Sequence, residues 1–222
     1  MSESPTLTDE CHLTYARQRE MADRSTLAAE VYPSRTRQRI ETRNRVFEAA
    51  IAEFRRVGVA AAQIEDIVRA AGVARGTFYL HFATKDHVLL EQLDRNQQAV
   101  AGRLEASFDT SPRSFLGRTV DLMLAQAADE SPALTRELFT AIGRRATEMD
   151  GQTIALAEVV TRFFAAAQKR GEVRTDLTPF ELTAVFLPGV FGLMLLRIDP
   201  PSPELRVTLQ HAVDVFVRGI AP

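Results

Sequence analysis

Several features that specialised protein classes require are scarce or missing in this sequence. Its 222 residues include a single cysteine, Cys11, so no disulfide can form within the chain, which suits a reducing compartment. Residues 1–30 contain no sustained apolar stretch of the kind found in a secretory signal. The longest uncharged apolar run, residues 182–196, contains Pro188 and is shorter than the roughly 20 residues that span a bilayer. We interpret it as a buried helix and expect a cytoplasmic protein without membrane association.

Residue groups that indicate catalysis or metal binding are also missing. The four histidines are scattered along the chain and no cluster of cysteines or carboxylates joins them: His12, His81, His87 and His211. We find no nucleophile–base pair, no glycine-rich phosphate loop and no metal-ligand spacing. The sequence therefore predicts a protein that is not an enzyme and that holds neither a cofactor nor a metal ion.

Strand signals are missing as well, because no alternating run of β-branched residues is bounded by hairpin turns. Apolar residues recur instead at helical spacing along the chain. Four pairs place a proline directly after a capping serine or threonine, which is a helix-start signature: Ser111-Pro112, Ser131-Pro132, Thr178-Pro179 and Ser202-Pro203. Together these patterns predict an all-α fold of about nine helices.

The charge is distributed unevenly along the chain. Residues 31–90 carry 10 basic and 6 acidic side chains, although the whole chain has a net charge of −2. A basic segment between acidic ones indicates contact with a polyanion such as nucleic acid. A solvated charged face explains the charge alone equally well.

Three short helical patterns occupy this basic segment. The first is an apolar stripe that ends at Gly58, and its members are Val46, Phe47, Ala50, Ile51, Phe54 and Val57. A second helix follows, and Gly72 then supplies a residue able to adopt positive φ before a third helix over about residues 74–80. Thr84 is a good N-cap for a fourth helix. The spacing predicts a helix-turn-helix over about residues 63–82, whose last helix enters a DNA major groove.

A more specific signal lies in the residues of that last helix. Residues 71–82 read Ala-Gly-Val-Ala-Arg-Gly-Thr-Phe-Tyr-Leu-His-Phe and are followed by Thr84-Lys85-Asp86. This run resembles the recognition-helix signature of the tetracycline-repressor (TetR) family, and the similarity extends back to Thr42-Arg43, over roughly 50 residues. The resemblance implies a helix-turn-helix DNA-binding domain over residues 34–83 and a helical effector-binding and dimerisation domain over residues 84–222. We interpret residues 1–33 as a flexible extension.

The resemblance and the chemistry of the side chains together predict the DNA contacts. Gly76 allows close approach of the backbone to DNA, and Thr77 offers a hydroxyl and a methyl group to a base edge. The predicted set is Thr42, Arg43, Gln63, Arg75, Gly76, Thr77, Tyr79, His81 and Lys85. Ala62, Gln63 and Ala74 depart from the family, which commonly has hydroxyl residues there, so Ala62 and Ala74 lack a capping and phosphate-binding side chain, and we expect the Gln63 amide to compensate by contacting phosphate or base.

The rest of the chain is rich in phenylalanine: nine of the thirteen lie at or beyond Phe108. Such residues are usually core filling, but the resemblance implies an effector pocket among them. The predicted pocket residues are Met123, Phe139, Phe163, Phe164, Phe186 and Met194, which suit an apolar effector. The predicted homodimer interface comprises Phe191, Leu205, Leu209, Val213, Phe216 and Val217, with a purely intramolecular core as the alternative.

The function implied by the resemblance is that of a sequence-specific transcription regulator. It would bind a palindromic operator in double-stranded DNA as a homodimer and act as a repressor that a small apolar effector releases. The alternative is a helical adaptor that binds protein partners and carries a non-functional DNA-reading head. The intact residues Gly76-Thr77 and 79–82 argue against that alternative.

Overall fold

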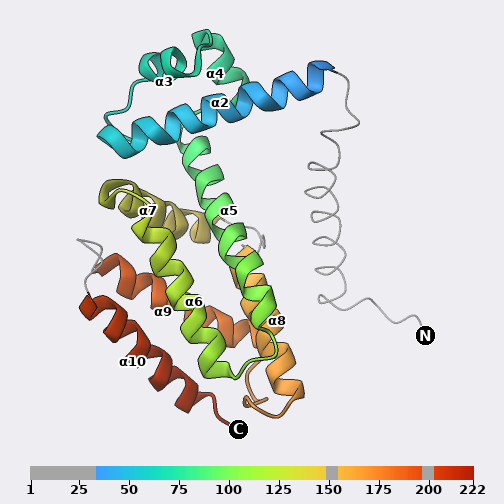
Figure 1. The fold of residues 1–222 in the computed structure, drawn as a ribbon. Coiled ribbons are helices and arrows are strands. Elements are labelled where there is room, and N and C mark those ends of the chain that lie inside the picture. The colour runs from blue at the N-terminus through green and yellow to red at the C-terminus, as the bar shows by residue number, and fades with distance from the viewer. Residues whose placement is uncertain (1–33, 149–154, 197–202) are drawn as a thin grey trace. The chain divides into compact units, whose positions relative to one another are not determined.

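The computed structural model describes residues 34–148, 155–196 and 203–222, and every regular element in this part of the chain is helical (Figure 1). It contains nine α-helices, and a short 3-10 helix, η2 (Glu105–Ser107), follows the fourth of them. The α-helices are α2 (Ser34–Val57), α3 (Ile64–Ala71), α4 (Arg75–His81), α5 (Lys85–Leu104), α6 (Pro112–Ala128), α7 (Pro132–Glu148), α8 (Ala155–Lys169), α9 (Pro179–Leu196) and α10 (Pro203–Gly219). The prediction of an all-α fold with about nine helices is confirmed for the described residues. The predicted extension, with Cys11, lies outside them.

The chain divides into two compact units, residues 1–47 and residues 48–222, and the boundary falls within α2. In the first unit the described residues form the beginning of α2, where Val46 and Phe47 are buried. The second unit contains the rest of α2 and all later helices. The predicted domain division at residues 33 and 83 stays a prediction.

Four helices begin at the prolines that the sequence marks as helix starts. Helices α6, α7, α9 and α10 all have proline as their first residue. The Ser111 hydroxyl accepts a hydrogen bond from the Ser114 N–H at 3.3 Å, and the Ser131 hydroxyl accepts one from the Leu134 N–H at 3.3 Å. These caps satisfy backbone donors that have no partner within the helix. The predicted helix starts are therefore confirmed.

Glycines form the turns around α3 and α4, and side-chain caps are missing at the start of both helices. Gly58 after α2 has φ +81° and Gly72 after α3 has φ +64°, values that favour glycine. Neither Gln63 before α3 nor Ala74 before α4 makes a side-chain capping bond. Thr84, by contrast, accepts a hydrogen bond from the His87 N–H and caps α5. All of this follows from the residue types at these positions.

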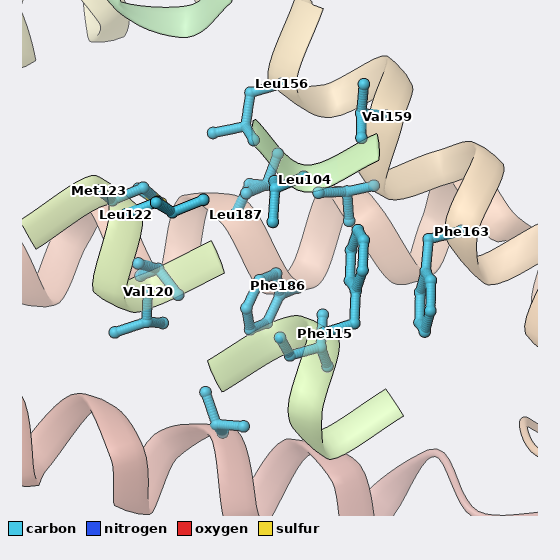
Figure 2. Close-up of a cluster of buried hydrophobic side chains, with 14 of the residues drawn as sticks. Leu104, Phe115, Val120, Leu122, Met123, Leu156, Val159, Phe163, Phe186 and Leu187 are labelled. Carbon is cyan, nitrogen blue, oxygen red and sulfur yellow. The ribbon is translucent and has the colours of Figure 1, made fainter. Parts of the chain in front are cut away.

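Helices α5 to α10 enclose one hydrophobic core rich in phenylalanine, part of which is drawn in Figure 2. The rings of Phe115 and Phe163 stack with centroids 3.7 Å apart and planes 2° from parallel. Phe164 and Phe186 are also buried in this core. Full burial of such side chains contributes about 1.5 to 3 kcal/mol each. The core therefore packs together helices that are distant in sequence, from α5 to α10.

Candidate DNA-binding site and effector cavity

Helix α4 buries one face and presents the other to solvent. Phe78 and Phe82 are 0% and 2% exposed, and they fix the helix against its neighbours. On the opposite face Arg75 and Gly76 are exposed, and the Tyr79 side chain is 47% exposed. A Cβ added to Gly76 would meet no atom within 4 Å, so nothing inside the chain requires glycine there. An external surface that approaches α4 closely would require it.

Arg75 already has partners on this exposed face. Its guanidinium forms an ion pair with Glu65 of α3, and its Nη2 donates to the Tyr79 hydroxyl at 3.5 Å. The hydrogen bond to Tyr79 and the negative charge of Glu65 raise the pKa of Arg75 above its ordinary value. The guanidinium is therefore held in place. A ligand that accepted hydrogen bonds from all of its N–H groups would have to displace Glu65.

Three other predicted contact residues lie at or near α4. Thr77 and His81 on α4 are half-buried, and Gln63, just before α3, is exposed. The amide of Gln63 donates to the Ala61 carbonyl at 3.0 Å. Thr42 and Arg43 belong to the first unit, where both side chains are half-buried on α2. Thr77 and His81 thus share α4 with Arg75, and Gln63 lies two residues before Glu65, the ion-pair partner of Arg75.

Lys85 has a role that the sequence did not indicate. Its ammonium donates to three backbone carbonyls in the loop between α2 and α3: Val59 at 2.7 Å, Ala60 at 3.1 Å and Ala62 at 3.0 Å. An ammonium has three N–H donors, and these carbonyls engage all of them. The Lys85 side chain therefore holds the start of α5 to this loop, and its predicted phosphate contact stays a prediction.

Leu80 is a further exposed residue of α4 that the sequence reasoning did not select. Its side chain is 68% exposed, although α4 buries Phe78 and the next residue after the helix, Phe82, is buried as well. An exposed apolar side chain beside Tyr79 can contact the methyl group of thymine. Sequence reasoning did not select Leu80 as a possible DNA contact because leucine in a helical pattern is normally assigned to the core.

A cavity lies among helices α5 to α9, with about 480 Å³ of empty space that includes space open to solvent. Met123 and Met194 lie in its wall, and Phe139 and Phe191 meet there edge to face with centroids 5.6 Å apart. Leu93, Val100, Leu138 and Leu156 complete the apolar part of the wall. Such a largely apolar enclosure is typical of a small-molecule site.

One part of the cavity wall is polar, which the sequence reasoning missed. It consists of Asn96, Gln97, Gln126, Glu130 and Thr135. These residues come from α5, α6, α7 and the turn before α7, so their proximity arises only when the helices pack. A second cavity of about 630 Å³ shares Glu130 and Thr135 with the first. Among the described residues, no group of three or more His, Cys, Asp or Glu could hold a metal ion.

Only part of the predicted pocket set lies in this wall. Met123, Phe139 and Met194 do, and effector binding to them stays a prediction. Phe163, Phe164 and Phe186 do not, because they fill the core between the helices. Helical spacing cannot separate a ring that faces a cavity from one that faces another ring.

The structure places the residues of the predicted dimer interface in or against the core of their own chain, or in the cavity wall. Leu205, Leu209 and Val213 of α10 are at most 2% exposed and pack into the core of their own chain. Phe216 and Val217 pack against the same core, and Phe191 lies in the cavity wall. Burial in the chain's own core produces the same helical periodicity as burial against a partner, so the α10 pattern alone does not separate the two, and the predicted interface stays a prediction.

Both α9 and α10 expose apolar side chains, which on α10 alternate with charged and polar ones. On α9 the exposed residues include Ala184, Val185, Pro188, Gly189 and Leu196, and on α10 they include Val207 and Val215. Among the described helices, α9 also has the length and composition that could cross a membrane, with a mean hydropathy of 1.7, and 33% of it is buried. The expectation of a buried helix is thus correct for only one of its faces. The other face of α9 is apolar and is exposed in the part of the chain that the structure describes.

Comparisons with known proteins agree with this geometry. The sequence model for the bacterial regulatory proteins of the tetR family matches residues 46–91. The chain is 35% identical to the HTH-type transcriptional regulator TtgR of Pseudomonas putida over 197 residues, which are 78% of this chain and 89% of that protein. It is 28% identical to the probable HTH-type transcriptional regulator ArpR of Pseudomonas putida, with the same shares of each chain covered. Thermus thermophilus FadR, a repressor solved in complex with lauroyl-CoA, has the same fold, with a TM-score of 0.65, 21% identity, and 81% of this chain and 95% of that chain covered.

Proposed function

The chain belongs to the tetR family of bacterial regulatory proteins and is a DNA-binding transcriptional regulator rather than an enzyme; from that premise we propose that it is a homodimeric repressor. Its α4 helices read a palindromic operator, and a small apolar effector in the cavity releases them. The observation that carries the proposal is the exposed face of α4, where Arg75, Gly76 and Tyr79 point away from the core. A repressor of this kind acts in the cytoplasm, where its operator is.

The proposed DNA contacts are of two kinds. Arg75, Thr77 and Leu80 lie on α4 and read base edges, because they offer a guanidinium, a hydroxyl and a methyl-rich surface. Tyr79, His81 and Gln63 contact phosphates and position the helix, with Gly76 allowing close approach. We retain Thr42 and Arg43 as phosphate contacts on the basis of the family resemblance. Lys85 acts indirectly by holding the loop at Val59 to Ala62.

The proposed dimer surface is formed by exposed apolar residues of α9 and α10. Val185 is 62% exposed, Leu196 is 82% exposed and Val215 is 70% exposed. Gly189 and Gly192 have open space where a side chain would project, so a partner helix can approach closely there. Exposed apolar surface of this extent normally marks a protein contact. A homodimer places two copies of α4 against two half-sites of one duplex.

The proposed effector is small and largely apolar. The cavity wall supports this, since Met123, Phe139, Phe191 and Met194 all line it, the last two from the C-terminal end of α9. Among proteins with the same fold, FadR of Thermus thermophilus was solved with lauroyl-CoA. SmeT, with a TM-score of 0.62, 21% identity, and 82% of this chain and 93% of that chain covered, is the repressor of the Stenotrophomonas maltophilia multidrug efflux pump SmeDEF.

Selection of bound duplexes from a random DNA library tests the proposal. The full chain is expected to enrich a roughly palindromic site whose half-sites lie about one helical turn, or a multiple of it, apart. Affinity for the enriched duplex should fall steeply with salt, because phosphate contacts release counterions. Sedimentation of the complex should give two chains per duplex. No enrichment over the starting library at low salt would contradict the proposed function.

A further inference from the structure

Glu130 occupies an unusual position for a carboxylate. It lies in the turn between α6 and α7, its side chain is only 2% exposed, and it contributes to the walls of both cavities. Burial of a charge is costly unless paired and hydrogen-bonded. The partners of Glu130 therefore show what this position is built to hold.

Two elements outside the α6–α7 turn supply those partners. Arg55, near the end of α2, donates to both carboxylate oxygens of Glu130, from Nε at 2.7 Å and from Nη2 at 3.0 Å. Gln92 of α5 donates to Glu130 Oε1 at 2.8 Å and also to Asn96 Oδ1 at 3.0 Å. The hydrogen bond to Glu130 raises the pKa of Arg55. One buried carboxylate thus links α2, α5 and the cavity wall.

The same wall holds a polar atom without a partner. Gln97 is 7% exposed, and its Oε1 accepts no hydrogen bond from any described residue. An unsatisfied buried acceptor costs free energy that a ligand donor would recover. Gln97 and Glu130 both line the cavity, so its wall offers a bound ligand an unpaired acceptor and a carboxylate.

We propose that Glu130 is the residue through which the effector acts on the DNA-reading helices, and that the effector is an apolar molecule carrying a hydrogen-bond donor such as an amine or a hydroxyl. The donor group competes with Arg55 for the carboxylate of Glu130, and an amine, which has further N–H donors, also binds Gln97 Oε1. The proposal rests on the proposed function, and it adds the chemical class of the effector and the contact that transmits its binding.

The ion pair between Arg55 and Glu130 lies next to the loop that leads to the DNA-reading helices. Arg55 lies just before the Gly58 turn that leads to α3, and Lys85 at the start of α5 holds the loop of that turn. With Arg55 paired to Glu130, the end of α2 is fixed to the α6–α7 turn. A ligand donor that takes over the carboxylate removes this restraint, and a ligand can shift the equilibrium only through such a difference in contacts. The DNA-binding arrangement is therefore the paired one.

Substitution of the pair tests the contact without any ligand. E130Q and R55Q are expected to weaken binding of the selected duplex by about 5- to 150-fold, the usual range of coupling between two sites. R55K keeps the charge but cannot form two parallel bonds, so it should weaken binding less. The matched control is R56Q, because Arg56 pairs with Glu53 on its own helix at 2.7 Å and does not reach the cavity.

E130Q separates this role from a direct electrostatic effect. The substitution removes a negative charge, which by itself increases attraction to DNA. Weaker binding by a variant that thermal unfolding shows to be folded therefore supports the restraint. Duplex affinity equal to or greater than that of the wild type in both E130Q and R55K would overturn it.

A matched set of probes tests the ligand class: octylamine, 1-octanol, heptyl methyl ether and octanoate. Calorimetry on the full chain without DNA should show the amine and the alcohol binding at least tenfold more tightly than the ether, which has no donor, or the anionic octanoate. The Q97L variant should reduce this preference. An ether or carboxylate that binds as tightly as the alcohol, or no binding by any probe, would overturn the ligand class. These measurements need no operator, so their failure is distinct from failure to select a duplex.

Discussion

The two ends of the second unit use their side chains in opposite ways. Around α4 a small core of Phe78 and Phe82 supports functional residues that point outward, such as Arg75 and Tyr79. Helices α5 to α10 pack their phenylalanines mainly in or against a common core, and the proposed effector site is an interior cavity. Substitutions on α4 should therefore change DNA binding without unfolding the chain, whereas substitutions among α5 to α10 should first change stability.

The largest effect is expected from the Phe115–Phe163 stack. Phe163→Ala should lower the free energy of unfolding by about 3 to 5 kcal/mol, because it leaves a cavity in a packed core. Denaturant titration measures the change. Phe180→Ala is the control, since Phe180 is 64% exposed on α9. Equal losses for the two variants would remove the contrast between core and surface phenylalanines.

Arg75→Ala should give the reverse pattern, with DNA binding weakened by about 1 to 3 kcal/mol and relaxed choice of bases at one position of each half-site. The unfolding free energy should change little, because the side chain is exposed. Arg69→Ala provides the control: Arg69 is also exposed and pairs with Asp66 on its own helix at 2.7 Å. Competition binding against a scrambled duplex measures both. Equal effects of the two variants would show that Arg75 contributes only non-specific electrostatic attraction to DNA and does not read a base.

A smaller effect is expected at the start of α9. The Thr178 hydroxyl accepts from the Glu181 N–H at 3.2 Å, and the Glu181 carboxylate accepts from the Thr178 N–H at 2.7 Å. Thr178→Ala should therefore cost about 1 kcal/mol of stability, a typical value for loss of an N-cap. Thermal unfolding of the variant at neutral pH measures this cost.

The same cap predicts a pH dependence. The Thr178 N–H, followed by its hydroxyl, lowers the pKa of Glu181 from its ordinary value of 4.5. A lowered folded-state pKa means that the stabilisation is present above pH 4.5 and is lost as the pH falls through the folded-state pKa. The difference between wild type and Thr178→Ala should narrow in that acidic range. A difference that grows on acidification would contradict the capping geometry.

The smallest effect is expected at Glu65. Glu65→Gln removes the carboxylate that holds Arg75 and should tighten DNA binding by about 0.2 to 1 kcal/mol, the usual worth of an exposed ion pair. Titrations of the duplex at low and at high salt measure it, and the gain should shrink at high salt. Weaker binding by this variant would show that Glu65 orients Arg75 for DNA instead of competing with it.

The sequence predicts the fold better than it predicts the interior site. Helix starts at Pro112 and Pro179 and the turns at Gly58 and Gly72 depend on local residue types, so they can be read one segment at a time. The cavity wall depends on packing between distant helices. Glu130 is an ordinary charged residue in the sequence, and only the structure shows that it is buried against Arg55.

Packing between distant segments also explains where the structure differs from what the sequence patterns suggest. The stripe of Leu205, Leu209 and Val213 has the periodicity of an interface, and burial within one chain has the same periodicity. Lys85 is a second case, because its cation fits a phosphate contact in the sequence, whereas the structure places the carbonyls of Val59 and Ala62 beside it. A helical pattern identifies a face but not what lies against it.

We propose that α4 reads a DNA sequence, and substitution of its Thr77 is the measurement that tests this proposal. Duplex selection should be run in parallel with the wild type and with Thr77→Val, which keeps the shape of the side chain and removes its hydroxyl. We predict that both proteins enrich sites with the same half-site spacing, and that the preferred base changes at one symmetric position. Identical enriched sites for the two proteins would contradict sequence reading by Thr77, and if Arg75→Ala also selected the same site, α4 would not be the reading helix.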